Sequence, residues 1–371
     1  MLFLLYENVP EQRSIMNQRT QRGRLWRPLA LIILLFLTCP AVAQRWTAQQ
    51  ANNWYKTQPF YVGANFIPNT AINQLEMWQA ETFDPATIDK ELAMAESVGM
   101  NIMRVFLHNL LWEKEPAAYK QRIDRFLDIA DRHKIKIMFV LFDSCWNDDP
   151  ALGKQMAPVV GKHNSGWVRG PGTKRLFDQR TWAGLERYTK DVLKTYATDR
   201  RVVVWDLFNE PSNSGYMDAV LPLLTKTFEW AQAVRPSQPL TVGWWHDHPL
   251  SNALLFAQSD IITFHNYRDP ANLEAQILDL QKQGRPLICT EYMARKHKST
   301  FETCLPIFKK YKVGAINWGL VKGKTNTIYA WDEPLPSGEE PKLWFHDIFR
   351  PDGSIYSQTE VAAIRKATGK L

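Results

Sequence analysis

The amino-acid sequence predicts the α/β class and, within it, a single-domain (β/α)8 TIM barrel. Eight short segments rich in β-branched and aromatic residues recur along the 371-residue chain, and longer segments with apolar residues at i, i+3 and i+4 separate them. Eight such units spread over residues 44–371 leave about 41 residues for each, which suits one barrel unit with its loops. No linker rich in Ser or Pro divides the chain, so we expect one domain.

The predicted strands are apolar almost throughout, which is typical of parallel strands that helices cover. In chain order they are Phe60–Phe66, Asn101–Phe106, Ile135–Phe142, Val202–Leu207, Leu240–Val242, Ile261–Phe264, Pro286–Thr290 and Gly314–Trp318. The helices predicted between them are Pro85–Ser97, Ala117–His133, Trp182–Thr198, Gly215–Val234, Ala271–Gln283 and Thr300–Lys310. A turn at Pro351-Asp352-Gly353 and a terminal helix, both within Trp344–Lys366, close the chain.

An open, doubly wound sheet is the competing architecture. Such a sheet usually carries a glycine-rich phosphate-binding turn after an early strand. The first predicted strand here runs into Gly63-Ala64-Asn65-Phe66, which contains no G-x-G-x-x-G pattern. The closed barrel is therefore favoured.

The longest interval without a predicted strand or helix is Ser144–Phe177. Loops of this length in a compact domain are usually functional or disordered. The aromatic residues Trp146 and Trp167 within it argue against disorder, so we expect this loop to contribute to a binding site.

The N-terminal 43 residues are predicted to be a signal peptide. Four arginines between positions 19 and 27 precede the apolar run Leu29–Leu37, and the small-residue triplet Ala41-Val42-Ala43 follows it. We expect cleavage after Ala43, with Met16 as an alternative start, and residues 44–371 as the mature, secreted or periplasmic domain. The run is too short for the usual spanning helix, so no stable membrane anchor is expected after cleavage. Lipidation at Cys39 is the less favoured alternative.

Charge and cysteine usage exclude several classes of partner. Of the net charge of +7, five Arg and two Glu lie in the signal segment, which leaves +4 for the rest without Lys/Arg clusters, so no nucleic-acid partner is expected. Cys145, Cys289 and Cys304 remain, an odd number without metal-ligand spacing. His246-Asp247-His248 places adjacent side chains on opposite faces and has no third ligand at a recognisable spacing, so neither a metal nor a cofactor is expected.

Two glutamates follow apolar strands where the active face of a barrel lies. Glu210 comes after the fourth predicted strand and Glu291 after the seventh. Two carboxyl groups facing each other across a barrel mouth are what cleavage of a glycosidic bond requires, one to protonate the leaving oxygen and one to meet the positively charged anomeric carbon. The alternative is that one of them caps a helix or forms a buried ion pair.

The segment Asp206-Leu207-Phe208-Asn209-Glu210-Pro211 resembles the Asn-Glu-Pro signature of the retaining clan A glycoside hydrolases, most of all family 5, the cellulase-like family. The resemblance extends over the chain as strand order. It implies that Glu210 is the general acid/base, that Glu291 is the nucleophile, and that Asn209 binds the sugar 2-hydroxyl.

Other strand ends also resemble the family. The resemblance implies that Arg104 lies beside the nucleophile, that His265 and Tyr267 form the family's His-x-Tyr pair, and that Trp318 is the platform under the sugar. The family commonly has a His near the end of strand three; this chain has none there, and His108 is the substitute we expect. The segment Gly63–Pro68 also resembles the barrel start of clan A family 2, which leaves the exact family open.

The tryptophan count of 15 suits a carbohydrate site, because an indole ring stacks on sugar C–H groups. Trp146, Trp167 and Trp245 lie in predicted loops at the active face and are expected sugar contacts, as is His246. Trp244 and Trp331 lie in the same group of loops. For any one of them packing is as good an explanation, since Trp is usually buried.

Together these features predict a retaining β-glycosidase that hydrolyses a β-linked oligo- or polysaccharide. Two alternatives remain: a catalytically silent glycan-binding protein on the same barrel, and a transglycosylase that uses the same residues. Endo or exo action depends on whether Ser144–Phe177 and the loop around Trp331 close one end of the cleft.

Overall fold

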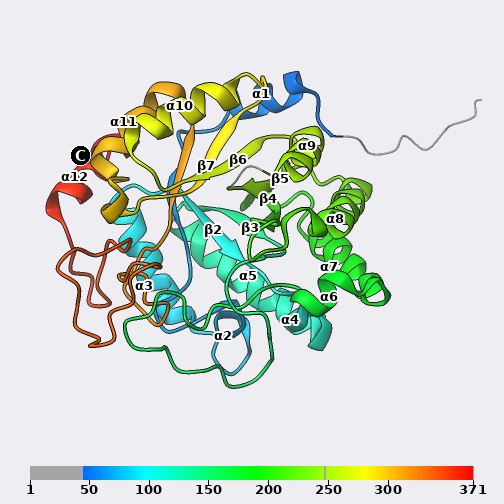
Figure 1. Ribbon diagram of the computed structural model, residues 1–371, viewed down its shortest axis with the longest axis horizontal. Helices are drawn as coiled ribbons and strands as arrows, with labels where there is room; N and C mark the ends of the chain where they lie inside the picture. The colour runs from blue at the N-terminus through cyan, green and yellow to red at the C-terminus, as the bar shows by residue number, and fades with distance from the viewer. Residues whose placement is uncertain (1–44, 246–247, 371) are drawn as a thin grey trace, which may run out of the picture. The chain divides into compact units, whose positions relative to one another are not determined.

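The computed structural model describes residues 45–245 and 248–370, and the predicted signal peptide lies outside them. Eight parallel strands form a closed barrel in the order β1 to β8, with β8 paired to β1, as predicted (Figure 1). The strands are β1 Val62–Asn65, β2 Ile102–Phe106, β3 Lys136–Val140, β4 Val202–Asn209, β5 Leu240–Trp244, β6 Ile262–Asn266, β7 Leu287–Tyr292 and β8 Gly314–Asn317. Each lies at one of the eight predicted segments.

Helices surround the barrel (Figure 1). They are α1 Ala48–Lys56, α2 Gln74–Trp78, α3 Pro85–Ser97, α4 Asn109–Lys114, α5 Pro116–Arg132, α6 Thr173–Phe177, α7 Trp182–Thr195, α8 Leu221–Val234, α9 Pro249–Gln258, α10 Pro270–Gln281, α11 Phe301–Tyr311 and α12 Gln358–Thr368. Short 3₁₀ helices lie at Gln179–Thr181, Met217–Val220 and Arg295–His297. None of the described helices has the length and apolarity needed to cross a membrane.

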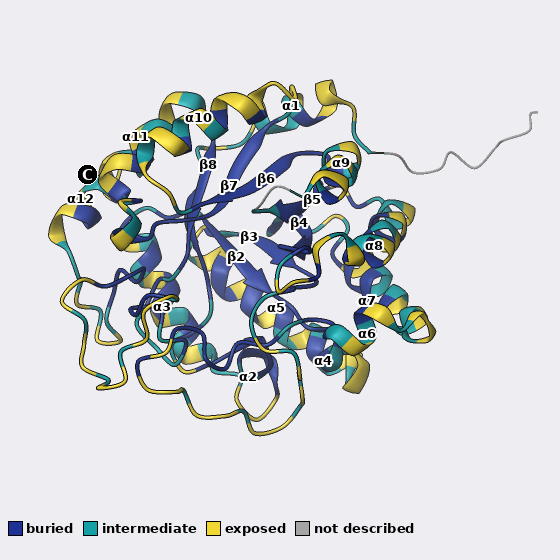
Figure 2. Ribbon diagram, viewed as in Figure 1, coloured by how far each residue is buried: buried dark blue, intermediate teal, exposed yellow. Residues whose placement is uncertain are grey.

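The helices form where local sequence favours them and bury one face. In α3, Asp84 caps the first turn by accepting a hydrogen bond from the Thr87 backbone N–H at 3.0 Å, and Pro85 occupies the first position. In α5, Ile123 and Leu127 recur at helical spacing and pack against the strands. Figure 2 shows the result: buried strands inside, and helices with exposed outer faces.

The barrel is closed at its N-terminal end by packing. Side chains at or near the starts of seven of the strands, among them Tyr61, Met138 and Ile288, form a cluster against which Trp46 and Trp54 pack. The segment with α1 is fixed there by the Trp46 N–H, which donates to Asp260 at 2.6 Å. Access to the polar interior is therefore from the opposite end.

Two long loops shape that opposite end. We name residues 141–172 the β3 loop and residues 318–357 the β8 loop. The predicted functional loop Ser144–Phe177 corresponds to the β3 loop together with α6, a short helix that the sequence did not predict. Figure 1 shows the two loops side by side, the β3 loop in green and the β8 loop in orange. The Asn164 N–H donates to the Thr325 carbonyl at 2.8 Å between them.

Candidate active site

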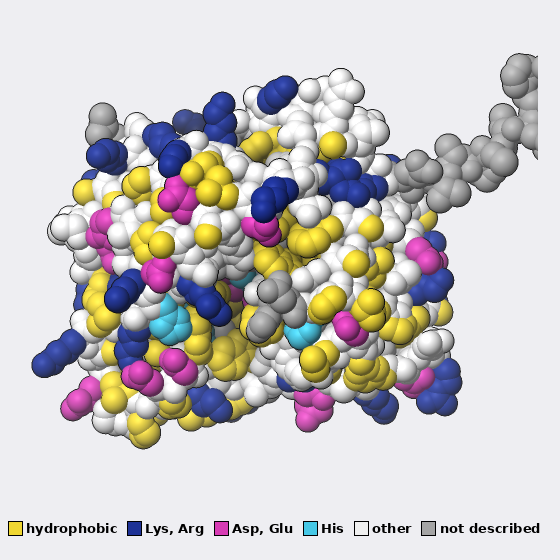
Figure 3. All heavy atoms as spheres, turned by 45° about the horizontal axis from the view of Figure 1, so that its top comes forward, with side chains coloured by type: hydrophobic (Ala, Val, Ile, Leu, Met, Phe, Trp, Pro, Cys, Tyr) yellow, Lys and Arg dark blue, Asp and Glu magenta, His cyan; other side chains and the backbone are white. Residues whose placement is uncertain are grey.

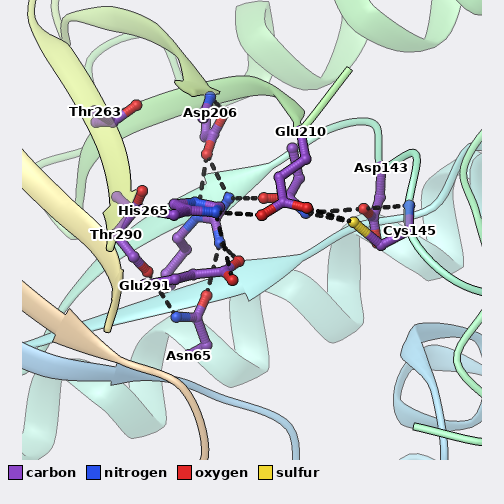
Figure 4. A network of polar contacts seen from close by, with 12 residues as sticks. Asn65, Asp143, Cys145, Asp206, Glu210, Thr263, His265, Thr290 and Glu291 are labelled. Atoms are coloured by element: carbon purple, nitrogen blue, oxygen red, sulfur yellow. Dashed lines mark hydrogen bonds and ion pairs between the residues drawn. The ribbon is translucent and has the colours of Figure 1, made fainter. Parts of the chain in front are cut away.

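Polar side chains converge at the C-terminal ends of the strands. Glu210 directly follows β4 and Glu291 lies in β7, on opposite sides of the barrel. Both are buried, and Figure 4 shows their carboxylates near the same space with His265 beside them. Glu210 has φ +42°, a left-handed backbone conformation that is costly for a residue with a side chain. Such strain is concentrated at functional sites, where it fixes the direction of a side chain.

Arg104 on β2 is the centre of a hydrogen-bond network beneath the cavity floor. Its guanidinium is fully buried, and it donates to Asp206 at 2.7 Å, to Glu291 at 2.8 Å and to Asn65 at 2.8 Å. It also donates to the Asn209 side-chain oxygen. Burial alone would lower the pKa of Arg104, but the charges of Asp206 and Glu291 outweigh it and raise the pKa. Arg104 is therefore a permanent cation that joins its own strand, β2, to three others, β1, β4 and β7.

Glu291 is held by charged and neutral donors. One carboxylate oxygen accepts from Arg104 at 2.8 Å, and the other accepts from the Tyr267 hydroxyl at 2.7 Å, with His265 Nδ1 3.4 Å away. The pKa of Glu291 is raised, because burial and the nearby charge of Glu210 outweigh the opposing effects of His265, Arg104 and the Tyr267 hydrogen bond. The Arg104 and Tyr267 contacts fix the carboxylate in place and favour its ionised form against that rise.

Glu210 has a different set of partners. One oxygen lies 2.6 Å from His265 Nδ1; the other accepts from the Cys145 thiol at 3.1 Å and from the Asn213 amide. Burial raises the pKa of Glu210, and the Cys145 and Asn213 hydrogen bonds oppose that rise. Burial also lowers the pKa of His265 to about 4, so the ring is neutral at pH 7. Glu210 thus lacks a cation in direct contact.

The two carboxylates and the imidazole lie close together. Ligand atoms of Glu210, His265 and Glu291, one from each, all lie within 4.8 Å of one another. Among the described residues this is the group that could hold a metal ion. A divalent cation there would face the positive charge of Arg104, so we assign no metal to it.

The site opens into a cavity of about 920 Å³. Figure 3 shows a hollowed face with hydrophobic side chains around the hollow. Six tryptophans line the cavity, namely Trp146, Trp167, Trp244, Trp245, Trp318 and Trp331. Asn209, Tyr267 and both glutamates also line it. The volume and the aromatic lining suit an oligosaccharide.

Most of the residues singled out in the sequence come together here, with two exceptions. His108 does not line the cavity: it is fully buried, caps α4 by accepting from the Leu110 N–H at 3.2 Å, and contacts the Arg169 carbonyl at 2.9 Å. The expectation that it contacts the sugar is therefore wrong. His246 lies outside the described residues.

Three side chains were not anticipated as site residues. Asp143, at the start of the β3 loop, accepts from Trp167 Nε1 at 2.7 Å and from the Asn209 amide at 2.9 Å, and burial raises its pKa to about 6. Cys145 and Asn213 contact Glu210. Two features of the sequence could have indicated them. Asp143 is a polar residue directly after an apolar run, and Asn213 lies three residues after Glu210.

A closed (β/α)8 barrel with two facing carboxylates at its mouth is typical of glycoside hydrolases, whose substrates are carbohydrates. Residues 62–323 match the family model described as cellulase (glycosyl hydrolase family 5). The chain belongs to glycosyl hydrolase family 5. A search of the curated proteins found no match.

Solved structures of similar fold include two mannanases and a mannosidase. The endo-β-1,4-mannanase from Thermotoga petrophila has a TM-score of 0.56 and 16% identity, covering 85% of this chain and 77% of that chain. The endo-1,4-β-mannanase from Rhizomucor miehei has a TM-score of 0.54 and 15% identity, covering 85% and 96%. The exo-β-1,4-mannosidase from Opitutaceae bacterium strain TAV5 has a TM-score of 0.57 and 17% identity, covering 84% and 60%. At these identities the likeness concerns the fold.

Proposed function

We propose that the chain is a retaining β-glycosidase in which Glu291 is the nucleophile and Glu210 is the general acid/base. The observation that carries the proposal is the short separation of the two carboxylates, whose facing atoms lie within 4.8 Å. Retaining enzymes have carboxyl groups about 5–5.5 Å apart, whereas inverting enzymes leave about 6.5–9.5 Å for a water molecule.

The division of roles follows from the neighbours of each carboxylate. Glu291 touches the cation Arg104, which favours the ionised form that a nucleophile needs. Glu210 touches a neutral imidazole, a thiol and an amide, so its buried carboxyl can keep a proton at higher pH. Two carboxyl groups in one cavity thereby differ in protonation.

The reaction then proceeds in two displacements. Glu291 attacks the anomeric carbon while Glu210 gives its proton to the departing glycosidic oxygen, and the glycosyl group becomes bound to Glu291. Glu210, now ionised, takes a proton from water, and the resulting hydroxide displaces Glu291 with net retention of configuration. If a sugar hydroxyl replaces water in the second step, the product is a transglycosylation product.

The sugar remains to be identified by assay. The structural neighbours named above are described as acting on β-1,4-mannan or mannosides. β-Mannosides are therefore the first substrates to test, with β-glucosides beside them.

Replacing Glu210 with Ala tests its role through the leaving group. With a poorly activated alkyl glycoside, kcat/KM is expected to fall by about 10³-fold, because general acid catalysis contributes about 10²–10⁴-fold. With a 2,4-dinitrophenyl glycoside, whose leaving group needs no proton, kcat/KM is expected to fall much less. The exposed Glu229→Ala is the matched control.

Equal losses on both substrates would contradict an acid role for Glu210. In the same experiments, ¹H NMR of the wild-type reaction is expected to show the β-anomer first. Initial release of the α-anomer would show inversion and exclude the double displacement.

Replacing Cys145 with Ala should change the pH profile. The thiol hydrogen bond stabilises the ionised form of Glu210, so its loss raises the pKa of Glu210. Since activity is lost as pH rises through that pKa, the alkaline limb of kcat/KM is expected to move to higher pH by roughly half to one unit. The control is Cys304→Ala, a buried thiol that contacts Ser299. An unchanged or lowered alkaline limb would contradict the prediction.

A further inference from the structure

The β3 and β8 loops join to form a wall over one side of the barrel mouth. In the closed barrel, β3 and β8 flank β1 and β2, so loops that follow them can meet above these two strands. The Asn164 N–H donates to the Thr325 carbonyl at 2.8 Å, and the Leu335 N–H donates to the Gly161 carbonyl at 2.9 Å. A Cβ atom at Gly161, which has φ +65°, would lie 1.7 Å from the Leu335 carbonyl oxygen. The backbones therefore meet directly.

The junction of the two loops is buried. His163 and Asn164 are 2% and 1% exposed. The β3 loop is also bound to α2, where Asn73 donates to the Gly166 carbonyl at 2.8 Å and Gln74 donates to the Val168 carbonyl at 2.7 Å. Opening the wall would break all of these contacts, so it is a fixed boundary of the cavity.

The wall stands close to the nucleophile. The Tyr267 hydroxyl donates to Glu291 at 2.7 Å, and the Tyr267 ring packs on Trp331 with ring centroids 4.8 Å apart. Trp331 in turn packs on His163, with centroids 6.1 Å apart. Only two aromatic rings therefore lie between the nucleophile and the loop junction, which leaves little length for glycan on this side.

The side of the cavity above β4 to β6 is open, in contrast to the side that the wall covers. Ser214, Arg268 and Asn272 line the cavity there and are exposed. Glu210 follows β4 on this side, and the leaving group must depart past the residue that protonates it. The aglycone therefore faces the open side, and the sugar that becomes bound to Glu291 faces the wall.

Asn164 and His163 at the junction carry polar groups suited to a sugar. Both line the cavity. Among the described residues, neither the Asn164 amide nitrogen nor its oxygen has a hydrogen-bond partner, although both are buried. An unpaired buried amide is costly, and a rotation of the Asn164 side chain toward the cavity would let sugar hydroxyls pair with both of its atoms. His163 Nδ1 donates to the Tyr329 carbonyl at 2.8 Å, and burial lowers the pKa of His163 to about 4, so Nε2 is left as an acceptor.

We propose that the enzyme acts from the non-reducing end of its glycan, with the terminal sugar seated against this wall and its hydroxyls bound by Asn164 and His163. The inference rests on the proposed retaining hydrolysis. It adds the end of the glycan at which hydrolysis starts and the release of one sugar at a time. An internal segment of a polymer cannot bind, because the wall occupies the place of the preceding sugars. Chain ends enter from the open side.

The products of labelled oligosaccharides test this mode without any mutation. The substrates are β-1,4-mannohexaose and cellohexaose, each labelled with 2-aminobenzamide at its reducing end. Chromatography separates the early products. The expected labelled products shorten by one sugar at a time, and polymer viscosity stays nearly constant. Early labelled fragments of mixed internal length, or labelled monosaccharide as the first product, would overturn the proposal. If hydrolysis occurs in either pattern, the proposed hydrolase function stands; no hydrolysis of any glycan or aryl glycoside would remove both.

Asn164→Ala tests the residue itself. Because the amide is unpartnered in the unliganded protein, its removal is expected to leave Tm unchanged or higher, while kcat/KM for an aryl glycoside falls about tenfold or more through KM. The control, Asn53→Ala on the exposed face of α1 at the closed end of the barrel, is expected to leave kcat/KM for the aryl glycoside unchanged. Unchanged kcat/KM in Asn164→Ala, or a loss that merely follows a lower Tm, would overturn the assignment.

Discussion

Replacing Glu291 with Ala is expected to lower kcat on an aryl β-glycoside by about 10⁵-fold, because no other group can form the glycosyl intermediate. Added azide should then restore activity and yield the α-glycosyl azide. The small anion fills the space of the missing carboxylate, and Arg104, which donates to Glu291 at 2.8 Å, remains to attract it. Product anomer by NMR and rate against azide concentration are the measurements.

The corresponding variant of Glu210 distinguishes the roles of the two glutamates. Glu210→Ala with azide and an activated substrate is expected to give the β-glycosyl azide, because azide then replaces water in the second step. A β-azide from Glu291→Ala would exchange the two assignments. Glycan binding that survives in both variants, together with a wild-type protein inactive on a broad glycan panel, would instead favour a binding protein on this barrel.

Arg104→Ala is expected to cost about 3–5 kcal/mol of unfolding free energy, as well as most of the activity. Its removal leaves Asp206 and Glu291 buried with no cation beside them, and breaking a buried ion pair has costs of this size. Urea unfolding at pH 7 measures the loss. A decrease below about 1 kcal/mol would show that the network adds little to stability.

The loss of unfolding free energy in Arg104→Ala is expected to grow as pH rises. Burial already raises the folded-state pKa of Asp206, and the charge of Arg104 opposes that rise. Removing Arg104 should therefore raise the pKa of Asp206 further, so that the folded protein holds the extra proton more strongly than the unfolded protein does. Stability is then present at low pH and is lost as pH rises through the folded pKa, so the deficit should be larger at pH 7 than at pH 5. The control is Arg201→Ala: Arg201 has three carboxylate partners, one more than Arg104, but it is 24% exposed, and the loss is expected to be within about 1 kcal/mol.

The barrel could be predicted from sequence because its determinants are local. Buried parallel strands show as short apolar runs, and α3 was located at its observed bounds because Asp84 and Pro85 mark its start. Helices α1 and α9 were not predicted. Helix α1 contributes one fully buried residue, Ala51, and so has little apolar periodicity to detect.

The candidate site was predictable only where residues lie at strand ends. There the barrel itself brings side chains together, so the Arg104–Glu291 and Tyr267–Glu291 contacts were expected and are found. The position of Asn164 depends on contacts between two loops, and its partner Thr325 lies 161 residues further along the chain, a relation that no local pattern encodes. His108 was misassigned because its side chain serves as a helix cap instead of facing the cavity.

The closed end of the barrel has a consequence for biosynthesis. The Trp46 N–H pairs with Asp260, 214 residues further along the chain, and β1 pairs with β8, Val62 lying opposite Ala315. While the ribosome is still making the first half, β1 can pair with β2, but its other edge lacks β8 and Trp46 lacks Asp260. Contacts this distant in sequence also slow folding. The barrel can therefore close only after nearly the whole chain has been synthesised, and one edge of β1 stays unpaired until then.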